Sequence, residues 1–170
     1  ALFAIVDLAG PQVHFRSADT VIPELLPRAQ AECIQIVSVG GPLFFLGVAK
    51  LMRQVQQVAR SRTIVLDLAG VSSIDDSGAL MLRRIAEDCR RANQPLYLAN
   101  VGKDSLRTLL RLGVIEALGR RRVCRGLRTA LLRAAKESHR ASAVEAVSGH
   151  LSPAEGERTG GFNNAAASPS

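Results

Sequence analysis

The sequence predicts an α/β fold, with a mixed, mostly parallel central sheet of four or five strands covered by about four helices. Short runs rich in β-branched residues alternate along the chain with amphipathic segments of helical period. Such alternation places helices against a sheet whose strands run mostly parallel. The chain has 170 residues, of which 47% are hydrophobic. That length and composition suffice for one buried core with terminal extensions.

The first part of the core is expected to hold three strands and one helix. Ile34 to Val39 is predicted to be a strand, Gly40-Gly41-Pro42 a turn, and Leu43 to Leu46 a short second strand. Apolar residues then recur at helical spacing from Val48 to Val58, which indicates an amphipathic helix. Thr63 to Leu68 is an almost continuous apolar run, typical of a buried central strand.

The second part continues the alternation after a turn at Gly70. Ser77 to Arg91 has a helical apolar face that includes Cys89, and Leu96 to Ala99 is expected to be the next strand. A short helix over Asp104 to Leu112 should turn Leu106, Leu109 and Leu110 inward. Gly113 fits a left-handed position at its end. The remaining elements are an edge strand at Val123-Cys124 and a last helix over Leu127 to Lys136.

The chain divides into three expected regions. Residues 1–31 have no sustained period and are interrupted by prolines, so they are predicted to be a connector, and residues 32–137 form the domain. Residues 138–170, rich in Ala, Ser, Gly and Glu, are predicted to be a disordered tail. The apolar start, Ala1 to Val6, is too short for a membrane helix and lacks the basic segment of a signal peptide, so this piece is expected to be soluble.

Several classes of chemistry have no support in the sequence. The three cysteines lie far apart, with no Cys/His cluster, so no metal site is expected, and unpaired cysteines suit a reducing cytoplasm. His14, His139 and His150 lie far from the acidic residues, so no catalytic triad is expected, and no phosphate-binding glycine loop is present. Catalytic residues are therefore not expected.

The net charge of +7 is concentrated in one segment. Residues 120–140 contain eight Lys or Arg and one acid, Glu137, so this segment carries the whole net charge. The candidate contacts for an anion or a partner are Asp67, Arg120, Arg121, Arg122 and Arg125. The arginines would suit an anionic lipid or an acidic protein, although a solvated basic face is an equally simple interpretation. With one Tyr and no Trp, the chain offers no evident base-stacking platform, so nucleic acid is not an expected partner.

The most informative stretch joins the central strand to the following helix. After Asp67, the loop Ile74-Asp75-Asp76-Ser77-Gly78 places acids and a hydroxyl at a helix start, where Asp76 or Ser77 suits the N-cap. Gly78 would let a backbone or ligand come close. Three adjacent polar groups exceed what one cap needs, which favours a regulatory contact loop over a simple cap.

These residues resemble the STAS family. The resemblance rests on Asp67-Leu68, on the loop of residues 74–78 and on the segment Leu109-Leu110-Arg111-Leu112-Gly113-Val114, and it covers roughly residues 32–136. The family comprises C-terminal domains of SulP sulfate permeases and bacterial anti-sigma-factor antagonists. The run Pro42-Leu43-Phe44-Phe45 is more similar to the permease branch. In the antagonist branch a phosphorylatable Ser follows the Asp that Asp75 matches, whereas here Asp76 stands in that place.

The resemblance implies a regulatory and interaction domain at the cytoplasmic face of the cell membrane, as part of a SulP-type anion transporter. Its implied partners are the transmembrane domain of the same protein and a second copy in a homodimer. The transported anion, sulfate, bicarbonate or another, stays open. Nucleotide binding has been discussed for the family, but nothing in these residues independently indicates it, so no cofactor is assigned. Two alternatives remain.

The first alternative is a free-standing antagonist that binds an anti-sigma kinase. The second is a phosphoacceptor receiver domain, which Asp67, Asp75, Asp76 and Lys103 loosely resemble. Receivers place an acidic pair before the acceptor Asp, whereas here the pair follows the single Asp67, which argues against a receiver.

Overall fold

The computed structural model describes residues 12–21, 24–60 and 62–148. Within them, five strands form one sheet in the order β1-β2-β3-β4-β5. Strand β1 is antiparallel to β2, and the other neighbours are parallel. The α/β fold with a mixed, mostly parallel sheet is therefore confirmed. The strands are β1 (Gln12–Ser17), β2 (Ile34–Leu43), β3 (Thr63–Ile74), β4 (Leu96–Ala99) and β5 (Val123–Cys124).

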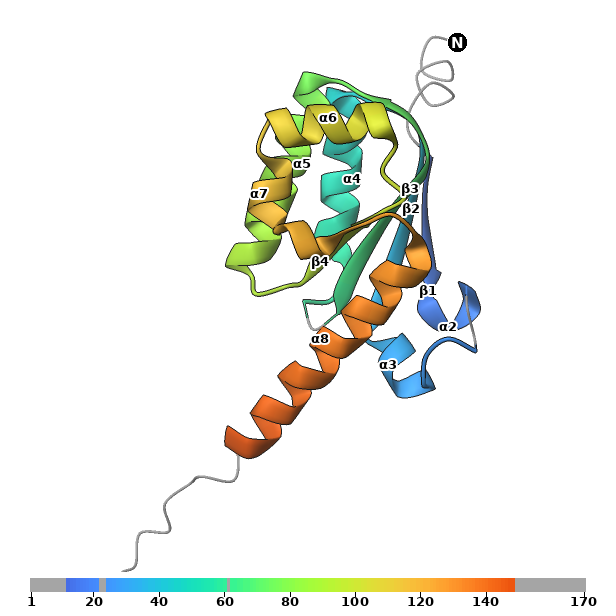
Figure 1. The fold of residues 1–170 in the computed structure, drawn as a ribbon, viewed down its shortest axis with the longest axis vertical. Coiled ribbons are helices and arrows are strands. Elements are labelled where there is room, and N and C mark those ends of the chain that lie inside the picture. The colour runs from blue at the N-terminus through green and yellow to red at the C-terminus, as the bar shows by residue number, and fades with distance from the viewer. Residues whose placement is uncertain (1–11, 22–23, 61, 149–170) are drawn as a thin grey trace, which may run out of the picture.

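Helices cover both faces of this sheet (Figure 1). One face carries α4 (Phe45–Gln57), α5 (Asp76–Arg91), α6 (Lys103–Arg111) and α7 (Val114–Leu118). The other carries α8 (Leu127–Ser148) and the short α3 (Arg28–Glu32), while α2 (Ala18–Val21) follows β1. A 3-10 turn, η1 (Arg120–Arg122), precedes β5.

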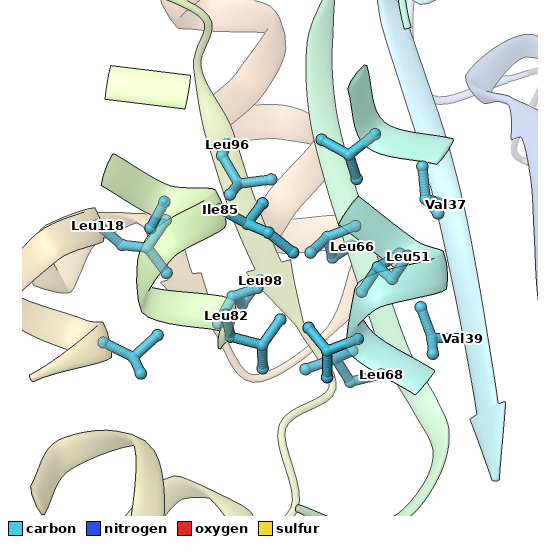
Figure 2. Packing of buried hydrophobic residues seen from close by; sticks show 14 of the residues in the cluster. Val37, Val39, Leu51, Leu66, Leu68, Leu82, Ile85, Leu96, Leu98 and Leu118 are labelled. Carbon is cyan, nitrogen blue, oxygen red and sulfur yellow. The ribbon is translucent and has the colours of Figure 1, made fainter. Parts of the chain in front are cut away.

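The core lies in two layers because strand side chains alternate between the faces. Leu66 of β3 packs beneath α4 and α5 with Leu51, Leu82 and Ile85, as Figure 2 shows, and each of these is at most 2% exposed. Val65, its neighbour in the strand, points to the α8 side. Both faces of the central strand are therefore dry, which explains its continuous apolar run.

The described part of the expected connector, residues 1–31, contains a strand of the sheet. Strand β1 pairs along its whole length with β2, from Gln12 opposite Gly40 to Ser17 opposite Gln35. It has no apolar period because it is an edge strand and most of its side chains are exposed. Backbone pairing, which leaves little trace in composition, adds this segment to the sheet. Residues 1–11 lie outside the described part of the chain.

Two expected turns are wrong, because β2 and β3 continue through their glycines. Gly41 has a φ of 83°, and the β2–β3 register shifts on either side of it, so the strand bends and does not end until Leu43. Gly70 pairs with Gly40, and a Cβ at Gly70 would lie 3.0 Å from the Gly40 Cα. The glycines therefore permit close strand approach. No separate strand forms over residues 43–46, since α4 begins at Phe45.

Other differences concern the later helices. Leu110, expected to be inward, is 52% exposed, whereas Leu109 is fully buried. The left-handed Gly113 is confirmed, with a φ of 73°, but it leads into α7, which was not expected. Helix α8 runs to Ser148, so the first residues of the predicted disordered tail are helical. Residues 149–170 lie outside the described part of the chain. No helix in the described part is both long and apolar enough to cross a bilayer.

Candidate functional site

The N-terminus of α5 lies at the carboxyl edge of the sheet, meaning the edge where the parallel strands β2 to β5 end. Asp75 is the N-cap, where Asp76 or Ser77 had been expected. Its Oδ1 accepts a hydrogen bond from the Gly78 backbone N–H at 2.6 Å. The Ser77 hydroxyl donates to the same carboxylate at 2.9 Å. Asp75 therefore satisfies a free backbone donor of the helix, and Ser77 supports Asp75.

Gly78 is required by close packing against the end of β2. A Cβ at this position would lie 2.2 Å from the Leu43 carbonyl oxygen, and real Cβ atoms essentially never come that close. The expectation that Gly78 lets a backbone approach is confirmed by this contact. The first turn of α5 is thereby held against the β2–α4 junction.

Asp76 pairs with Arg111 from the last turn of α6. The two guanidinium nitrogens donate to the two carboxylate oxygens, with 3.1 Å between Nη1 and Oδ2. The hydrogen bond from Arg111 holds the pKa of the Asp76 carboxyl below its ordinary value, and the same bond raises the pKa of Arg111. Both side chains remain mostly exposed. The fold thus joins the two sequence motifs, 35 residues apart, through one bidentate ion pair.

Three exposed apolar side chains lie on the elements that adjoin this ion pair. Phe44 precedes α4 and is 48% exposed, Leu80 in α5 is 51% exposed, and Leu110 in α6 is 52% exposed. Leu80 lies four residues after Asp76, so it shares that helix face, and Leu110 adjoins Arg111. Sequence reasoning missed Phe44 and Leu80 as surface residues. A signal existed for Leu80, because Arg83 and Arg84 lie three and four residues further along the same face.

Asp67 is a structural residue in the middle of the sheet. It accepts hydrogen bonds from the Asn100 amide at 2.8 Å and from the Ala69 backbone N–H at 3.2 Å. Arg16 of β1 lies 3.8 Å from its other oxygen, and only 8% of the Asp67 side chain is exposed. A carboxylate so enclosed links β1, β3 and the end of β4, and it is not accessible to a large partner.

The acids near the carboxyl edge have separate partners. Asp67 is bonded to Asn100, Asp75 to Ser77 and Gly78, and Asp76 to Arg111. In the part of the chain that the structure describes, no three His, Cys, Asp or Glu side chains are placed to hold a metal ion. The arrangement therefore gives a rigid surface and no convergent acidic site.

Among the basic residues, Arg122 is bound inside the domain. Its guanidinium donates to Glu137 of α8, and its Cζ lies 5.9 Å from the centre of the Tyr97 ring. The Tyr97 hydroxyl donates to the same carboxylate. Burial raises the pKa of Tyr97, and the hydrogen bond to Glu137 raises it further. Arg122 therefore fastens η1 and α8 to β4, and it is a poor candidate for contact with a partner.

The other candidate arginines are exposed, and basic residues of α8 lie beside them. Arg120, Arg121 and Arg125 have exposed side chains. Arg133 donates to the Arg121 carbonyl oxygen at 2.7 Å, which places α8 alongside η1 and β5. This brings three exposed basic residues of α8 into the same region, and sequence reasoning had not singled them out: Arg128, Arg133 and Lys136.

The family model of the STAS domain matches residues 26–130, which is more than half of the chain, so the chain belongs to the STAS domain family. Among solved structures it is similar to a sulfate transporter family protein from Wolinella succinogenes. The two are 28% identical with a TM-score of 0.58, and the match covers 74% of this chain and 99% of that one.

Two other solved structures show a likeness of fold alone, because each is below 25% identity. The murine anion transporter Slc26a9 is 23% identical with a TM-score of 0.60, covering 78% of this chain and 24% of that one. RsbS from Moorella thermoacetica is 15% identical with a TM-score of 0.52, covering 64% of this chain and 92% of that one. Among curated proteins, none matches.

Proposed function

We propose that this STAS domain is the regulatory domain of a SulP-type anion transporter and lies at the cytoplasmic face of the membrane. The observation that carries the proposal is the likeness to the Wolinella succinogenes sulfate transporter family protein, which extends over nearly all of that chain at 28% identity. The fold likeness to Slc26a9 is consistent with this assignment. The sulfate named for the relative belongs to that family of proteins, and the anion of this transporter stays open.

The α5 loop supports the transporter assignment over the antagonist one. A kinase-switched antagonist needs a hydroxyl at the position that Asp76 occupies, so that phosphorylation adds charge there. Here the charge is permanent and is neutralised by Arg111. The neighbouring Ser77 hydroxyl is already donated to Asp75. The loop is therefore a fixed surface, and a phosphorylation switch would have to break the N-cap arrangement.

The surface formed by Phe44, Leu80, Leu110 and the Asp76–Arg111 pair is the proposed contact with the transmembrane domain. In many protein interfaces, apolar side chains supply the buried area and nearby ion pairs fix the orientation of the partner. The prediction of a contact loop from Asp75, Asp76 and Ser77 loses its original support, because each of these side chains has a partner within the domain. In the intact transporter this surface would transmit the position of the domain to the anion pathway, and two copies of the protein would associate.

Two measurements test this function. The coding sequence upstream of Ala1 should encode several apolar spans of about 20 residues, whereas an initiator Met directly upstream would contradict the proposal. In the intact transporter, Leu80→Ser with Leu110→Ser should reduce anion uptake per molecule while the isolated domain keeps its melting temperature. The matched control is Phe15→Ser on the edge strand β1, where Phe15 is 43% exposed.

A third experiment tests the alternative that the chain is an anti-sigma-factor antagonist. Incubation of the chain with an anti-sigma kinase and ATP should leave Ser77 unmodified and form no stable complex. Phosphorylation of Ser77, or a complex with such a kinase, would reassign the domain to the antagonist branch.

A further inference from the structure

Six exposed cations form a basic flank along η1, β5 and the first half of α8. The flank comprises Arg120, Arg121, Arg125, Arg128, Arg133 and Lys136. The contact between the Arg133 guanidinium and the Arg121 carbonyl oxygen ties its two halves together. Arg122 and Glu137 lie within it but neutralise each other.

The flank cations have no carboxylate partner within 4.0 Å among the described residues, since none of the ion pairs formed there includes them. Elsewhere in the described chain, Arg28, Arg83, Arg91 and Arg107 each pair with an acid three or four residues away. Exposed arginines without such a partner, for example Arg53 and Arg84, lie on different helices. A concentrated, unneutralised positive surface attracts anions and raises their local concentration.

Part of the flank and the start of β1 both lie near the carboxyl edge of the sheet. Gln12, the first described residue, lies opposite Gly40 near the carboxyl end of β2. Arg125 and Arg128 follow β5, which pairs with the carboxyl end of β4 through Cys124 and Ala99. If a membrane segment precedes the domain, as the proposed function holds, this edge is the one kept near the bilayer.

We infer that the basic flank rests on an anionic lipid surface; this inference depends on the proposed function for its orientation. The chemistry favours lipid headgroups over an acidic protein. A tight protein contact needs apolar or aromatic anchors in pockets, and the flank offers only the half-exposed Leu132. Six long cationic side chains spread over one helix and a loop instead match the diffuse charge of laterally mobile headgroups.

The expected strength follows from the number of cations. Each Lys or Arg near an anionic leaflet raises the affinity roughly fivefold. A flank of six therefore gives measurable binding to vesicles even without a membrane anchor, and a tether to the same membrane would strengthen it by raising the effective concentration. Because the attraction is electrostatic, it must weaken as salt is added.

The test is vesicle cosedimentation of the whole 170-residue chain. Vesicles of 70% phosphatidylcholine and 30% phosphatidylglycerol should bind it at low salt, binding should be lost in about 0.5 M NaCl, where the Debye length is only a few ångström, and pure phosphatidylcholine should not bind. Arg125→Gln with Arg128→Gln should weaken binding about 25-fold, from two cations. The control, Arg53→Gln with Arg84→Gln on the α4–α5 face, removes the same charge from exposed residues and should weaken it far less.

Three outcomes would overturn the inference: no binding to anionic vesicles at low salt, an equal loss in the control pair, or capture of the chain by soluble polyglutamate without vesicle binding. The last would assign the flank to an acidic protein. Thermal melts of all variants confirm that they are folded. Vesicle binding without membrane spans upstream would disprove the transporter assignment and leave the lipid-binding flank in place, so the two proposals fail separately.

Discussion

The α5 loop and the basic flank carry charge in opposite ways. In the loop, every charged or hydroxyl group has a partner inside the domain: Asp75 caps α5, Ser77 donates to Asp75, and Asp76 pairs with Arg111. Beside the flank, Arg122 is paired with Glu137, whereas its neighbours Arg121 and Arg125 have no acid partner among the described residues. In the sequence both regions look like exposed charge. The comparison shows that charges neutralised within the fold must be subtracted before a charged motif is used by itself to predict a partner surface.

The largest expected effect tests whether the loop is part of the architecture. Gly78→Ala should destabilise the domain by about 3 kcal/mol, because the new Cβ collides with the Leu43 backbone and the helix must move. Urea unfolding followed by circular dichroism measures the loss. The matched control is Gly102→Ala, where nothing lies within 4 Å of an added Cβ. Gly102 is the N-cap of α6, and exchanging Gly for Ala there should cost about 1 kcal/mol or less. Equal losses in the two variants would refute the close packing of α5 on β2.

The next largest effect distinguishes Arg122, which is bound to Glu137, from the exposed Arg125. Glu137→Ala should cost about 1–2 kcal/mol, since it leaves the Tyr97 hydroxyl and Arg122 without their shared acceptor. Arg125→Ala should change stability by less than about 0.5 kcal/mol, because its side chain is exposed and has no acid partner in the described chain. The free energy of unfolding of each variant is the measurement. A large loss for Arg125→Ala would mean that the flank is structural.

Within the loop, the cap should outweigh the hydroxyl that supports it. Asp75→Ala removes the acceptor for the Gly78 N–H and should cost about 1 kcal/mol. Ser77→Ala removes a hydrogen bond to Asp75 but leaves the cap, so it should cost less. Asp75→Asn keeps an acceptor and should recover most of the loss. Thermal melts of the three variants would contradict this order if Ser77→Ala were the most damaging.

The smallest effect is the pH dependence of the exposed ion pair. The pKa of Asp76 is lowered in the folded state, so its stabilising contribution is present above the ordinary carboxyl pKa and is lost as pH falls through the lowered value. Wild type should therefore be slightly more stable than Asp76→Asn at pH 7, and the difference should vanish in strong acid. Added salt should also shrink it. Arg111→Gln is the reciprocal control and should follow the same profile. A difference that grows in acid would disprove the pairing.

Much of the fold followed from local pattern. Strand β4 coincides with the expected Leu96 to Ala99, and α5 begins one residue before its expected start. Cys89 is buried on the apolar helix face as expected, and burial raises the pKa of its thiol to about 11. Strand β4 was predictable because all of its residues are apolar and buried, and α5 because its apolar residues keep helical spacing along its length. The match to the STAS family agrees with the resemblance seen in the loop and in the segment of residues 109–114.

What only the tertiary structure decided lies in contacts between distant segments. Strand β1 exists because β2 offers it an edge, and neither β2 nor β3 ends at its glycines because the two strands need them for close approach. Arg111 neutralises Asp76 across 35 residues, and Glu137 removes Arg122 from the exposed charges. Sequence period reports which face of an element avoids water, since that depends on its own side chains. It does not report which charges meet, because that depends on where the whole chain places them.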